Sequence, residues 1–337
     1  MLNIGIIGAG RIGKVHAQAI ANYVTTAKVT AMMSPSCRPD TVEWAKGLGI
    51  EKITKDYKEI LADPSIDAVF ICTPTDTHSA ISLEAIAAGK HVFCEKPIDH
   101  DVGRINEVLD ALKAAPKLKF MVGFNRRFDH NFRAVRNAVE NGSVGKVELV
   151  KITSRDPEPP SAEYAARSGG IFLDMTIHDF DMVRYLSGEE VVEVYTQPAV
   201  LVDPAIGEAG DFDSAVITMK LASGALAVID NSRRCAYGYD QRAEVFGSAG
   251  AAVSKNDSAS NVQVWSNTGE TGEKPLFFFL ERYMQAFATE VQEFIEAVVN
   301  DTPVPVDAQA GLEAVLIGIA ATKSAKEGRP VKISEIV

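Results

Sequence analysis

Three polar side chains in this sequence stand where they could transfer a proton: Lys96, Asp174 and His178. Lys96 lies between Glu95 and Pro97, directly after an apolar run, and the proline restricts the backbone before it. Asp174 and His178 are four residues apart, so one turn of helix would bring both to the same face. An amine, a carboxylate and an imidazole that meet at one hydroxyl group can bind it and remove its proton. The pattern therefore indicates acid–base chemistry on an alcohol.

Simpler explanations exist for the same residues. Lys96 is compatible with an ordinary surface loop, and His178 with a capped helix in which the imidazole is satisfied. A metal site on Asp174 and His178 lacks a third ligand at a suitable spacing, so no metal is expected. A Ser/His/Asp hydrolase is excluded because the chain has no GxSxG motif.

The first strand-like run of the chain leads into a glycine turn and then into a helical pattern. The turn reads Gly8-Ala-Gly10-Arg-Ile-Gly13. In such a turn Gly8 allows a tight bend, Gly10 lets the backbone approach a pyrophosphate, and Gly13 lets helix and strand pack closely. The amides at the helix start point toward negative charge. We therefore predict a nucleotide cofactor, against the alternative of a glycine-rich turn that binds nothing.

The end of the second strand bears on which dinucleotide is bound. NAD-specific folds of this type carry an acidic residue there, which hydrogen-bonds the ribose 2′-hydroxyl. This chain has Ser34 instead, with Arg38 nearby, and Asp40 is too far along to replace the acid. A hydroxyl and a guanidinium would accept a 2′-phosphate, and Arg11 could lie on the adenine or add a further cation. We expect NADP rather than NAD; in the alternative, Arg38 is a solvated loop residue and NAD, or either dinucleotide, is used.

Alternating strands and helices make up the first part of the chain. Strands separated by helices imply parallel pairing with right-handed crossovers. The fold class is therefore α/β, beginning with a Rossmann domain, a doubly wound parallel sheet, over residues 1–123. The predicted strands are 4–7, 28–33, 68–72, 91–94 and 119–122, and the predicted helices are 12–23, 41–48, 57–61, 77–88 and 102–114.

The carboxyl ends of two of these strands carry further candidates. Thr73 and Pro74 follow one strand, with His78 four residues later, and Glu95 and Lys96 follow the next strand. Ligands of open α/β sheets bind outside such ends. We therefore expect these residues to contact the cofactor, with Glu95 orienting the turn or touching the cofactor ribose.

Consecutive strands replace this alternation after residue 123. They predict an α+β domain over residues 124–337, with a large open, mostly antiparallel sheet that serves substrate binding and oligomerisation. An uncovered sheet face would be buried against another subunit, so we expect a homotetramer or a homodimer. The predicted helices are 131–141, 171–186, 283–299 and 308–326, and the predicted strands are 147–154, 191–196, 214–221, 225–231 and 243–246.

Composition limits the partners. The 337 residues carry a net charge of 34 − 45 = −11, which makes nucleic acid an unlikely partner. No apolar run approaches the roughly 20 residues that span a bilayer, so no membrane partner is expected. The four cysteines are widely spread without a CxxC pair, which indicates a reducing, cytoplasmic compartment.

The glycine turn, Glu95-Lys96-Pro97 and the Asp174/His178 pair together resemble the glucose–fructose oxidoreductase/inositol dehydrogenase family, over essentially the whole chain. The resemblance implies oxidation of a sugar or polyol alcohol with a pyridine nucleotide, and a catalytic group of Lys96, Asp174 and His178. The full set of predicted cofactor contacts is Gly8, Gly10, Arg11, Ile12, Gly13, Ser34, Arg38, Thr73, Pro74, His78, Glu95 and Lys96.

Within that family, residues 123–129, 154–157, 169–181 and 237–241 are similar to the bacterial inositol 2-dehydrogenases. By that resemblance Arg127, Asp156 and Tyr239 bind the substrate together with Asp174 and His178. A cyclitol has a hydroxyl on every carbon, so its site needs many donors and acceptors. Ser34 departs from the family members that use NAD, which carry an acid there.

The expected reaction is oxidation of a secondary alcohol of a cyclitol, myo-inositol or an isomer, to the ketone, with hydride passing to the nicotinamide. Lys96 and His178, linked through the substrate, would remove the hydroxyl proton, and Asp174 would orient His178 or hold a neighbouring hydroxyl. This requires the groups at 96 and 178 to converge on one alcohol. The alternatives are an NADP-linked aldose or anhydrosugar oxidoreductase, a glycoside-cleaving relative, and a non-catalytic nucleotide sensor.

Overall fold

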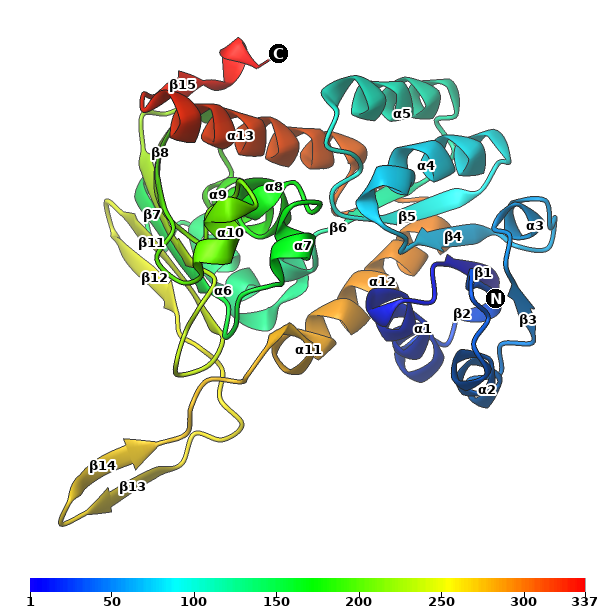
Figure 1. The fold of residues 1–337 in the computed structure, drawn as a ribbon, viewed down its shortest axis with the longest axis horizontal. Helices are drawn as coiled ribbons and strands as arrows, with labels where there is room; N and C mark the ends of the chain where they lie inside the picture. The colour runs from blue at the N-terminus through cyan, green and yellow to red at the C-terminus, as the bar shows by residue number, and fades with distance from the viewer. Residues whose placement is uncertain (337) are drawn as a thin grey trace. The chain divides into compact units, whose positions relative to one another are not determined.

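The computed structural model describes residues 1–336, which form two compact units (Figure 1). The first unit comprises Met1–Phe128 and Gln285–Glu313, and the second comprises Asp129–Met284 and the segment that begins at Ala314. The domain boundary expected after residue 123 stays a prediction. The structure adds that the chain returns to the first unit late in the sequence, which a linear pattern does not reveal.

Six parallel strands form the sheet of the first unit, in the order β3-β2-β1-β4-β5-β6. The predicted doubly wound parallel sheet is confirmed, and its direction of winding reverses between β1 and β4, where such sheets bind dinucleotides. The three-residue strand β3 has no counterpart in the sequence prediction. The strands are β1 (Leu2–Ile7), β2 (Ala27–Met33), β3 (Lys52–Thr54), β4 (Ala68–Ile71), β5 (His91–Glu95) and β6 (Phe120–Gly123).

Helices cover both faces of this sheet, and the central strands are accordingly buried on both sides. All four residues of β4 and all four of β6 are buried, as expected for parallel strands that helices enclose. The helical elements are α1 (Arg11–Tyr23), α2 (Pro39–Gly47), α3 (Lys58–Leu61), η1 (Thr75–Thr77), α4 (His78–Ala87), α5 (Val102–Ala114) and η2 (Asn125–Phe128).

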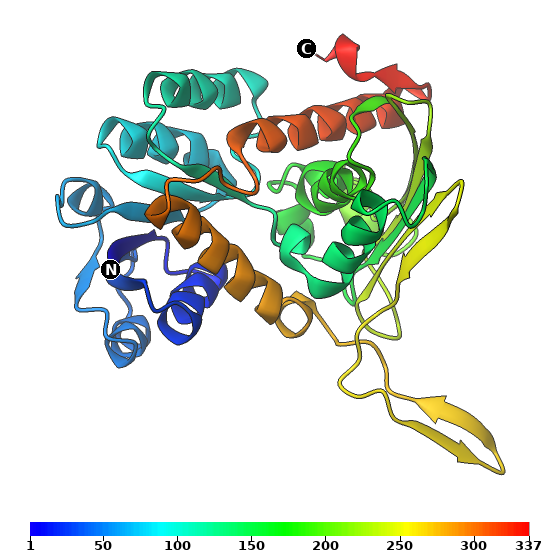
Figure 2. The ribbon, with the colours of Figure 1, turned by 180° about the vertical axis from the view of Figure 1, so that it is seen from behind.

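Helix α12 (Met284–Val299) supplies an aromatic face to the first unit. The ring of Phe294 lies 5.4 Å from that of Phe70 and 5.7 Å from that of Phe93, between ring centres. Phe287 of the same helix lies 5.7 Å from the ring of His16 on α1. Figure 2 shows α12, in orange, beside α1, in dark blue.

The second unit contains a seven-stranded sheet, in the order β12-β11-β7-β10-β9-β8-β15. Strands β7 and β10 are parallel and the other neighbouring pairs are antiparallel, which confirms the predicted mostly antiparallel sheet. The strands are β7 (Val147–Arg155), β8 (Val191–Ala199), β9 (Ser214–Leu221), β10 (Leu226–Ser232), β11 (Asp240–Gly247), β12 (Gly250–Ser254) and β15 (Val331–Lys332).

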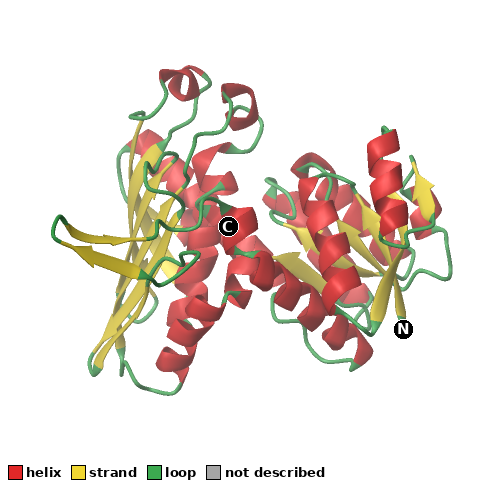
Figure 3. Ribbon diagram, turned by 90° about the horizontal axis from the view of Figure 1, so that it is seen from below, coloured by secondary structure: helices red, strands yellow, loops and turns green. Residues whose placement is uncertain are grey.

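The helices of the second unit gather on one face of its sheet (Figure 3). Residues in β9 alternate between exposed and buried, as they do when one sheet face packs on helices and the other meets solvent. None of the helices within residues 1–336 combines the length and apolar character needed to cross a membrane. The helical elements are α6 (His130–Glu140), α7 (Ala162–Ala165), α8 (Gly170–Asp174), α9 (Ile177–Ser187), α10 (Pro204–Glu208), α11 (Phe279–Arg282), η3 (Ile333–Glu335) and α13 (Ala308–Glu327), whose residues up to Glu313 belong to the first unit.

The single helix predicted over residues 171–186 is wrong in one respect, because two helices, α8 and α9, occupy this range. Between them, the backbone N–H groups of Met175 and Thr176 both donate to the carbonyl of Ile171, at 3.0 and 2.8 Å. The second bond spans five residues instead of four and widens the turn. Asp174 and His178 therefore lie on two successive helices, and the regular i, i+4 geometry expected of them does not apply.

A two-stranded hairpin, β13 (Gln263–Ser266) and β14 (Gly269–Gly272), projects from the second unit (Figure 1). Every residue in both strands is exposed, and Trp265 is 77% exposed. Such a hairpin is marginal in water by itself. Neither strand is among those that the sequence predicts.

Candidate active site

The glycine turn has the geometry of a dinucleotide cradle. A side chain at Gly8 would lie 2.6 Å from the carbonyl oxygen of Cys72, and one at Gly13 would lie 1.9 Å from the carbonyl oxygen of Gly8. A Cβ at Gly10 would instead meet nothing within 4 Å. The backbone of Gly10 thus borders open space at the start of α1, and this fits a bound pyrophosphate. Arg11 and Ile12 begin the helix at this point.

The predicted contacts to a 2′-phosphate differ in accessibility. Ser34 is buried, and its backbone N–H donates to the carbonyl of Thr54 at 2.9 Å. Arg38 is exposed, and its Nε lies 3.6 Å from a carboxylate oxygen of Asp40. A neighbouring carboxylate reduces the attraction of this arginine for phosphate. The two residues thus form a weaker phosphate site than the sequence suggested.

His78 lies in a supporting position behind the strand ends. It is buried at the start of α4, with Nε2 2.8 Å from the carbonyl oxygen of Thr73 and Nδ1 2.8 Å from that of Pro97. The imidazole therefore joins the loop after β4 to the loop after β5. Pro74 is exposed beside it. Thr73 and Pro74 keep the expected place at the carboxyl edge, while His78 holds that edge together.

Glu95 and Lys96 lie at the carboxyl end of β5, beside the end of β4. Both side chains are partly exposed, and the Lys96–Pro97 peptide bond is cis. Oε1 of Glu95 is 2.6 Å from Nε2 of the buried His16. Arg127 follows β6 in the short helix η2 and is also partly exposed. The first unit thus presents an acid and two cations at the edge where its cofactor cradle opens.

In the second unit the parallel pair β7–β10 brings together two residues that are far apart in the sequence. Asp156 follows β7 and Arg233 follows β10, and the backbone N–H of Asp156 donates to the carbonyl of Ser232 at 2.9 Å. A terminal nitrogen of Arg233 lies 3.8 Å from the Asp156 carboxylate. Carboxyl ends of parallel strands meet at one edge, which is why these two side chains converge.

Asp174 joins the same cluster from helix α8. Two nitrogens of Arg233 donate to its Oδ2, each at 3.1 Å, and the hydroxyl of Tyr164 donates to its Oδ1 at 3.0 Å. The cluster Asp156, Asp174, Arg233 and Tyr164 therefore offers the donors and acceptors that a polyhydroxylated ligand needs. Arg233 and Tyr164 are absent from the sequence prediction.

His178 stands near the start of α9, which a buried polar network holds in place. The hydroxyl of Thr176 donates to Oδ1 of Asn231 at 2.6 Å, and Nδ2 of Asn231 donates to Asp179 at 2.9 Å. All three of these residues are buried, whereas His178 is partly exposed. Because Asn231 is on β10, two residues before Arg233, the network ties the imidazole to the strand that carries the arginine.

Tyr239 contributes a buried ring to its unit. It is 6% exposed, and its ring lies 5.5 Å from that of Phe278 and 5.9 Å from that of Tyr283. The nearby Tyr237 is more accessible, and its hydroxyl contacts Arg155 and Asp240. Burial and the hydrogen bond to Asp240 raise the pKa of Tyr237 to about 12, so this hydroxyl keeps its proton. Tyr237 is thus better exposed to a ligand than the predicted Tyr239.

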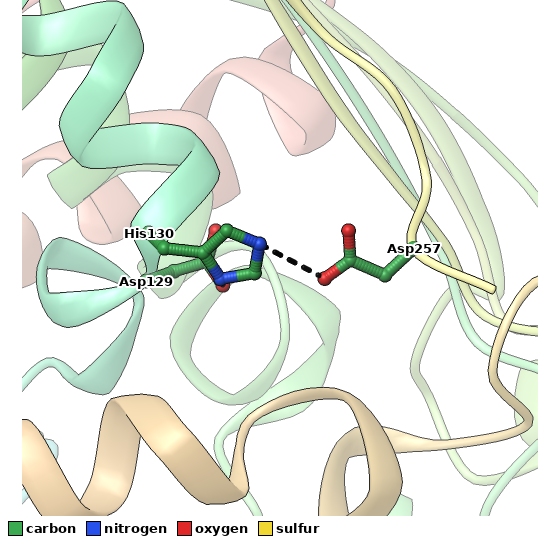
Figure 4. Close-up of side chains that lie close together, drawn as sticks. All are labelled: Asp129, His130 and Asp257. Atoms are coloured by element: carbon green, nitrogen blue, oxygen red, sulfur yellow. Dashed lines mark ion pairs between the residues drawn. The ribbon is translucent and has the colours of Figure 1, made fainter. Parts of the chain in front are cut away.

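A separate cluster of possible metal ligands contains Asp129, His130 and Asp257 (Figure 4). Nε2 of His130 is 3.5 Å from Asp257, the contact dashed in Figure 4. The buried Arg282 already forms ion pairs with both carboxylates, at 3.0 Å to Asp257. Its guanidinium supplies the positive charge that a metal would bring. Asp129 also caps α6 by accepting from the N–H of Asn131 at 3.1 Å, so the cluster is structural.

Comparison with known proteins places both units in one family. Residues 2–124 match the profile described as oxidoreductase family, NAD-binding Rossmann fold, and residues 132–253 match the GFO/IDH/MocA C-terminal domain.

Relatives match over almost the full length. The chain is 47% identical to myo-inositol 2-dehydrogenase of Thermotoga maritima over 337 residues, which is 100% of both chains. It is 45% identical to inositol 2-dehydrogenase of Rhizobium meliloti over 333 residues, 99% of each. The crystal structure of scyllo-inositol dehydrogenase from Lactobacillus casei with bound NAD(H) and scyllo-inositol superimposes with a TM-score of 0.91, at 32% identity and 99% coverage of both chains. This chain belongs to the GFO/IDH/MocA family of oxidoreductases, and its N-terminal part is an NAD-binding Rossmann domain.

Proposed function

We propose that this protein oxidises a secondary alcohol of a cyclitol, myo-inositol or an isomer, to the ketone with a nicotinamide dinucleotide as hydride acceptor. The observation that carries the proposal is the full-length similarity to relatives named inositol 2-dehydrogenase, at 45 to 47% identity. The hydrogen-bonding cluster around Arg233 supports it, because a cyclitol presents a ring of neighbouring hydroxyl groups.

The first unit supplies the cofactor half of the proposal. The bare backbone at Gly10, together with the close packing at Gly8 and Gly13, suits a pyrophosphate at the start of α1. Glu95 and Lys96 would face the nicotinamide half, because they end a strand beyond the reversal point of the sheet. The bound dinucleotide supplies hydride acceptance, and the protein supplies placement and charge.

The proposed roles of the polar side chains follow from their chemistry. Lys96 and His178 take the proton of the substrate hydroxyl, one directly and the other through the bound polyol. Asp174 holds a neighbouring hydroxyl, and the two hydrogen bonds from Arg233 orient its carboxylate. Asp156, Arg127 and Tyr237 bind further hydroxyl groups.

One assay tests the reaction. Myo-, scyllo- and D-chiro-inositol, glucose and xylose are each offered with NAD and with NADP, and reduced nicotinamide is followed by its absorbance. We expect the highest kcat/KM with an inositol. A preference for glucose or xylose would instead favour an aldose oxidoreductase. Dinucleotide binding without any polyol-dependent reduction would favour a nucleotide sensor.

The choice between the two dinucleotides is part of the proposal. The missing acid at Ser34 favours NADP, while the burial of Ser34 and the Arg38–Asp40 pair weaken that preference. We propose that NADP is accepted and preferred, and the same panel measures the preference. The proposed reaction does not depend on its outcome.

We also propose that the protein is a homotetramer or a homodimer that works in the cytoplasm. The sheet face that its own helices leave uncovered carries exposed Val216, Leu226 and Phe246, at 44 to 55% exposure. The apolar hairpin residue Trp265 is exposed as well. Apolar surface of this kind is normally covered by a partner. Light scattering coupled to gel filtration should therefore give two or four times the 36.3 kDa chain mass.

A further inference from the structure

A buried histidine contacts the acid that precedes Lys96. His16 lies on α1 with no exposed surface, and its ring is 4.9 Å from that of Phe93 and 5.7 Å from that of Phe287. In these apolar surroundings its one close polar contact among residues 1–336 is Glu95, with Nε2 2.6 Å from Oε1. A short contact between a ring nitrogen and a carboxylate is a strong hydrogen bond when one partner is charged.

The Glu95 carboxylate is confined from its other side as well. A Cβ built on Gly123, its partner in β6, would lie 3.1 Å from Oε2 of Glu95. The carboxylate therefore rests against bare backbone on one side and against the His16 imidazole on the other. Its side chain remains 15% exposed, at the carboxyl edge of the sheet. Glu95 thus offers a fixed acceptor to whatever occupies that edge.

The hydrogen-bond pattern indicates where the imidazole carries its proton. A carboxylate only accepts, so the proton of this bond is on Nε2 when Glu95 is ionised. Nδ1 of His16 is buried and has no hydrogen-bond partner among residues 1–336. A second N–H at that position would be buried without an acceptor, which is costly, so the neutral imidazole with its proton on Nε2 fits best.

A second buried acid, Glu290, faces the same region from α12. It lies on one helix face with Phe287 and Phe294, three residues after the first and four before the second. It has no exposed surface, and neither carboxyl oxygen has a hydrogen-bond partner among residues 1–336. Burial, followed by the charge of Glu95, raises the pKa of Glu290 well above its ordinary value. Burial without a hydrogen-bond partner therefore favours the neutral form of the Glu290 carboxyl.

We propose that His16 is a positioning residue for the reaction: its Nε2–H holds the Glu95 carboxylate in one orientation beside Lys96. The buried Glu290 takes part as a neutral carboxyl, which places no second negative charge beside Glu95. The inference rests on the proposed function, because it takes Glu95 to contact the nicotinamide half of the dinucleotide. The thiols of Cys72, which follows β4, and of Cys94 on β5 also lie near Glu95.

Two substitutions separate the hydrogen bond from the packing. His16→Phe keeps an aromatic ring but removes the donor, and His16→Gln keeps a donor with less ring packing. Binding of NADH and NADPH is measured by calorimetry without polyol, alongside kcat and KM for myo-inositol and the melting temperature. We expect His16→Phe to weaken binding of the preferred reduced dinucleotide by about tenfold or more, the scale of one hydrogen bond to a charged group. His16→Gln should recover most of this loss, and KM for the polyol should change little.

Two substitutions on α12 test whether the Glu290 carboxyl is neutral. Glu290→Gln replaces a neutral buried carboxyl by a neutral amide, and Glu296→Gln changes an exposed acid on the same helix. Both should bind the reduced dinucleotide like the wild type at neutral pH. A large loss of dinucleotide affinity in Glu290→Gln but not in Glu296→Gln would mean that Glu290 carries charge. This result would overturn the proposed role of Glu290 as a neutral carboxyl.

The outcomes distinguish this inference from the proposed function. If folded His16→Phe binds the dinucleotide as the wild type does, the positioning role is wrong whatever the substrate is. If His16→Gln is as impaired as His16→Phe, the ring and not its donor supports the site, and the inference is again wrong. A wild-type protein that binds dinucleotide but oxidises no polyol would contradict the proposed reaction, while the two His16 variants would still report on Glu95.

Discussion

Arg233 and Asp174 form an ion pair in which two guanidinium nitrogens share one carboxylate oxygen, at 3.1 Å each. The arginine side chain is 4% exposed and the aspartate 14% exposed, so the pair is largely withdrawn from water. The other oxygen of Asp174 accepts from Tyr164. With both oxygens engaged, the carboxylate has one preferred orientation, and a polyol hydroxyl would meet an acceptor that is already ordered.

Replacing Arg233 should therefore impair substrate binding more than cofactor binding. In Arg233→Gln the Asp174 carboxylate loses its charged partner inside a mostly buried site, which costs about 1 to 3 kcal/mol. We expect kcat/KM for the polyol to fall by about tenfold to 100-fold while the dissociation constant for the reduced dinucleotide stays within twofold of the wild-type value. Arg234→Gln, an exposed neighbour, is the control. Equal losses in both variants would remove the special role of Arg233.

The proton-transfer assignment predicts losses in turnover. Lys96→Ala and His178→Ala should each lower kcat by about 100-fold to 10,000-fold, the usual contribution of a positioned acid or base, with dinucleotide binding retained. Steady-state kinetics with myo-inositol and a calorimetric titration of the reduced dinucleotide measure the two quantities separately. Near-normal turnover in either variant would exclude that residue from proton transfer.

The sequence located the residues at the carboxyl edge of the first sheet, whereas it missed Arg233 and Tyr164 in the cluster of the second unit. The glycine turn and Glu95-Lys96 are contiguous motifs that follow strands, so the rule for parallel sheets locates them directly. Arg233 follows the strand predicted over residues 225–231 in the same way that Thr73 follows its own strand. The position of Arg233 after a strand is visible in the sequence. The sequence does not show, however, that this strand, β10, pairs in parallel with β7, because the neighbouring strands are antiparallel.

Two further errors have physical causes that a linear pattern does not carry. The helix around Asp174 is broken because an extra residue enters the turn at Thr176, and a buried hydrogen bond from Thr176 to Asn231 on β10 holds that turn. The aromatic face of α12 belongs to the first unit, although it is separated from that unit by the whole second sheet in the sequence. Long-range packing decides both features, and local propensity does not.

The proposed preference for NADP should be reversed by a substitution at Ser34. In Ser34→Asp a carboxylate at the end of β2 would accept a hydrogen bond from a ribose 2′-hydroxyl and repel a 2′-phosphate. We expect the ratio of kcat/KM for NAD to that for NADP to rise by about 100-fold, since opposed like charges cost several kcal/mol. KM for myo-inositol should not change. If the kinetics with NADP are unaltered, the 2′-phosphate does not lie near this residue.

The ion pairs of Arg282 should stabilise the second unit without taking part in catalysis. Arg282→Met leaves Asp129 buried without its partner, and breaking a buried pair in this way costs about 3 to 5 kcal/mol. His130→Gln, whose side chain is 61% exposed, should cost less than about 0.5 kcal/mol. Urea unfolding measures both free energies. Similar stabilities for the two variants would show that the cluster depends on something other than the arginine, such as a bound cation.

Glu290 should make the stability of the protein depend on pH. Burial raises the pKa of Glu290 in the folded chain, while in the unfolded chain it returns to about 4.5. Below pH 4.5 the Glu290 carboxyl is protonated in both the folded and the unfolded state, so its ionisation does not lower the free energy of unfolding. As the pH rises above 4.5 the unfolded state is favoured by ionisation, and the wild type should lose up to about 1.4 kcal/mol per pH unit relative to Glu290→Gln until the folded-state pKa is reached.

Urea unfolding of the wild type and of Glu290→Gln at a series of pH values measures this difference, and Glu296→Gln should show no such trend. If the difference in the free energy of unfolding between the wild type and Glu290→Gln stays constant between about pH 5 and about pH 8, Glu290 is ionised in the folded protein and a cation or donor compensates its charge.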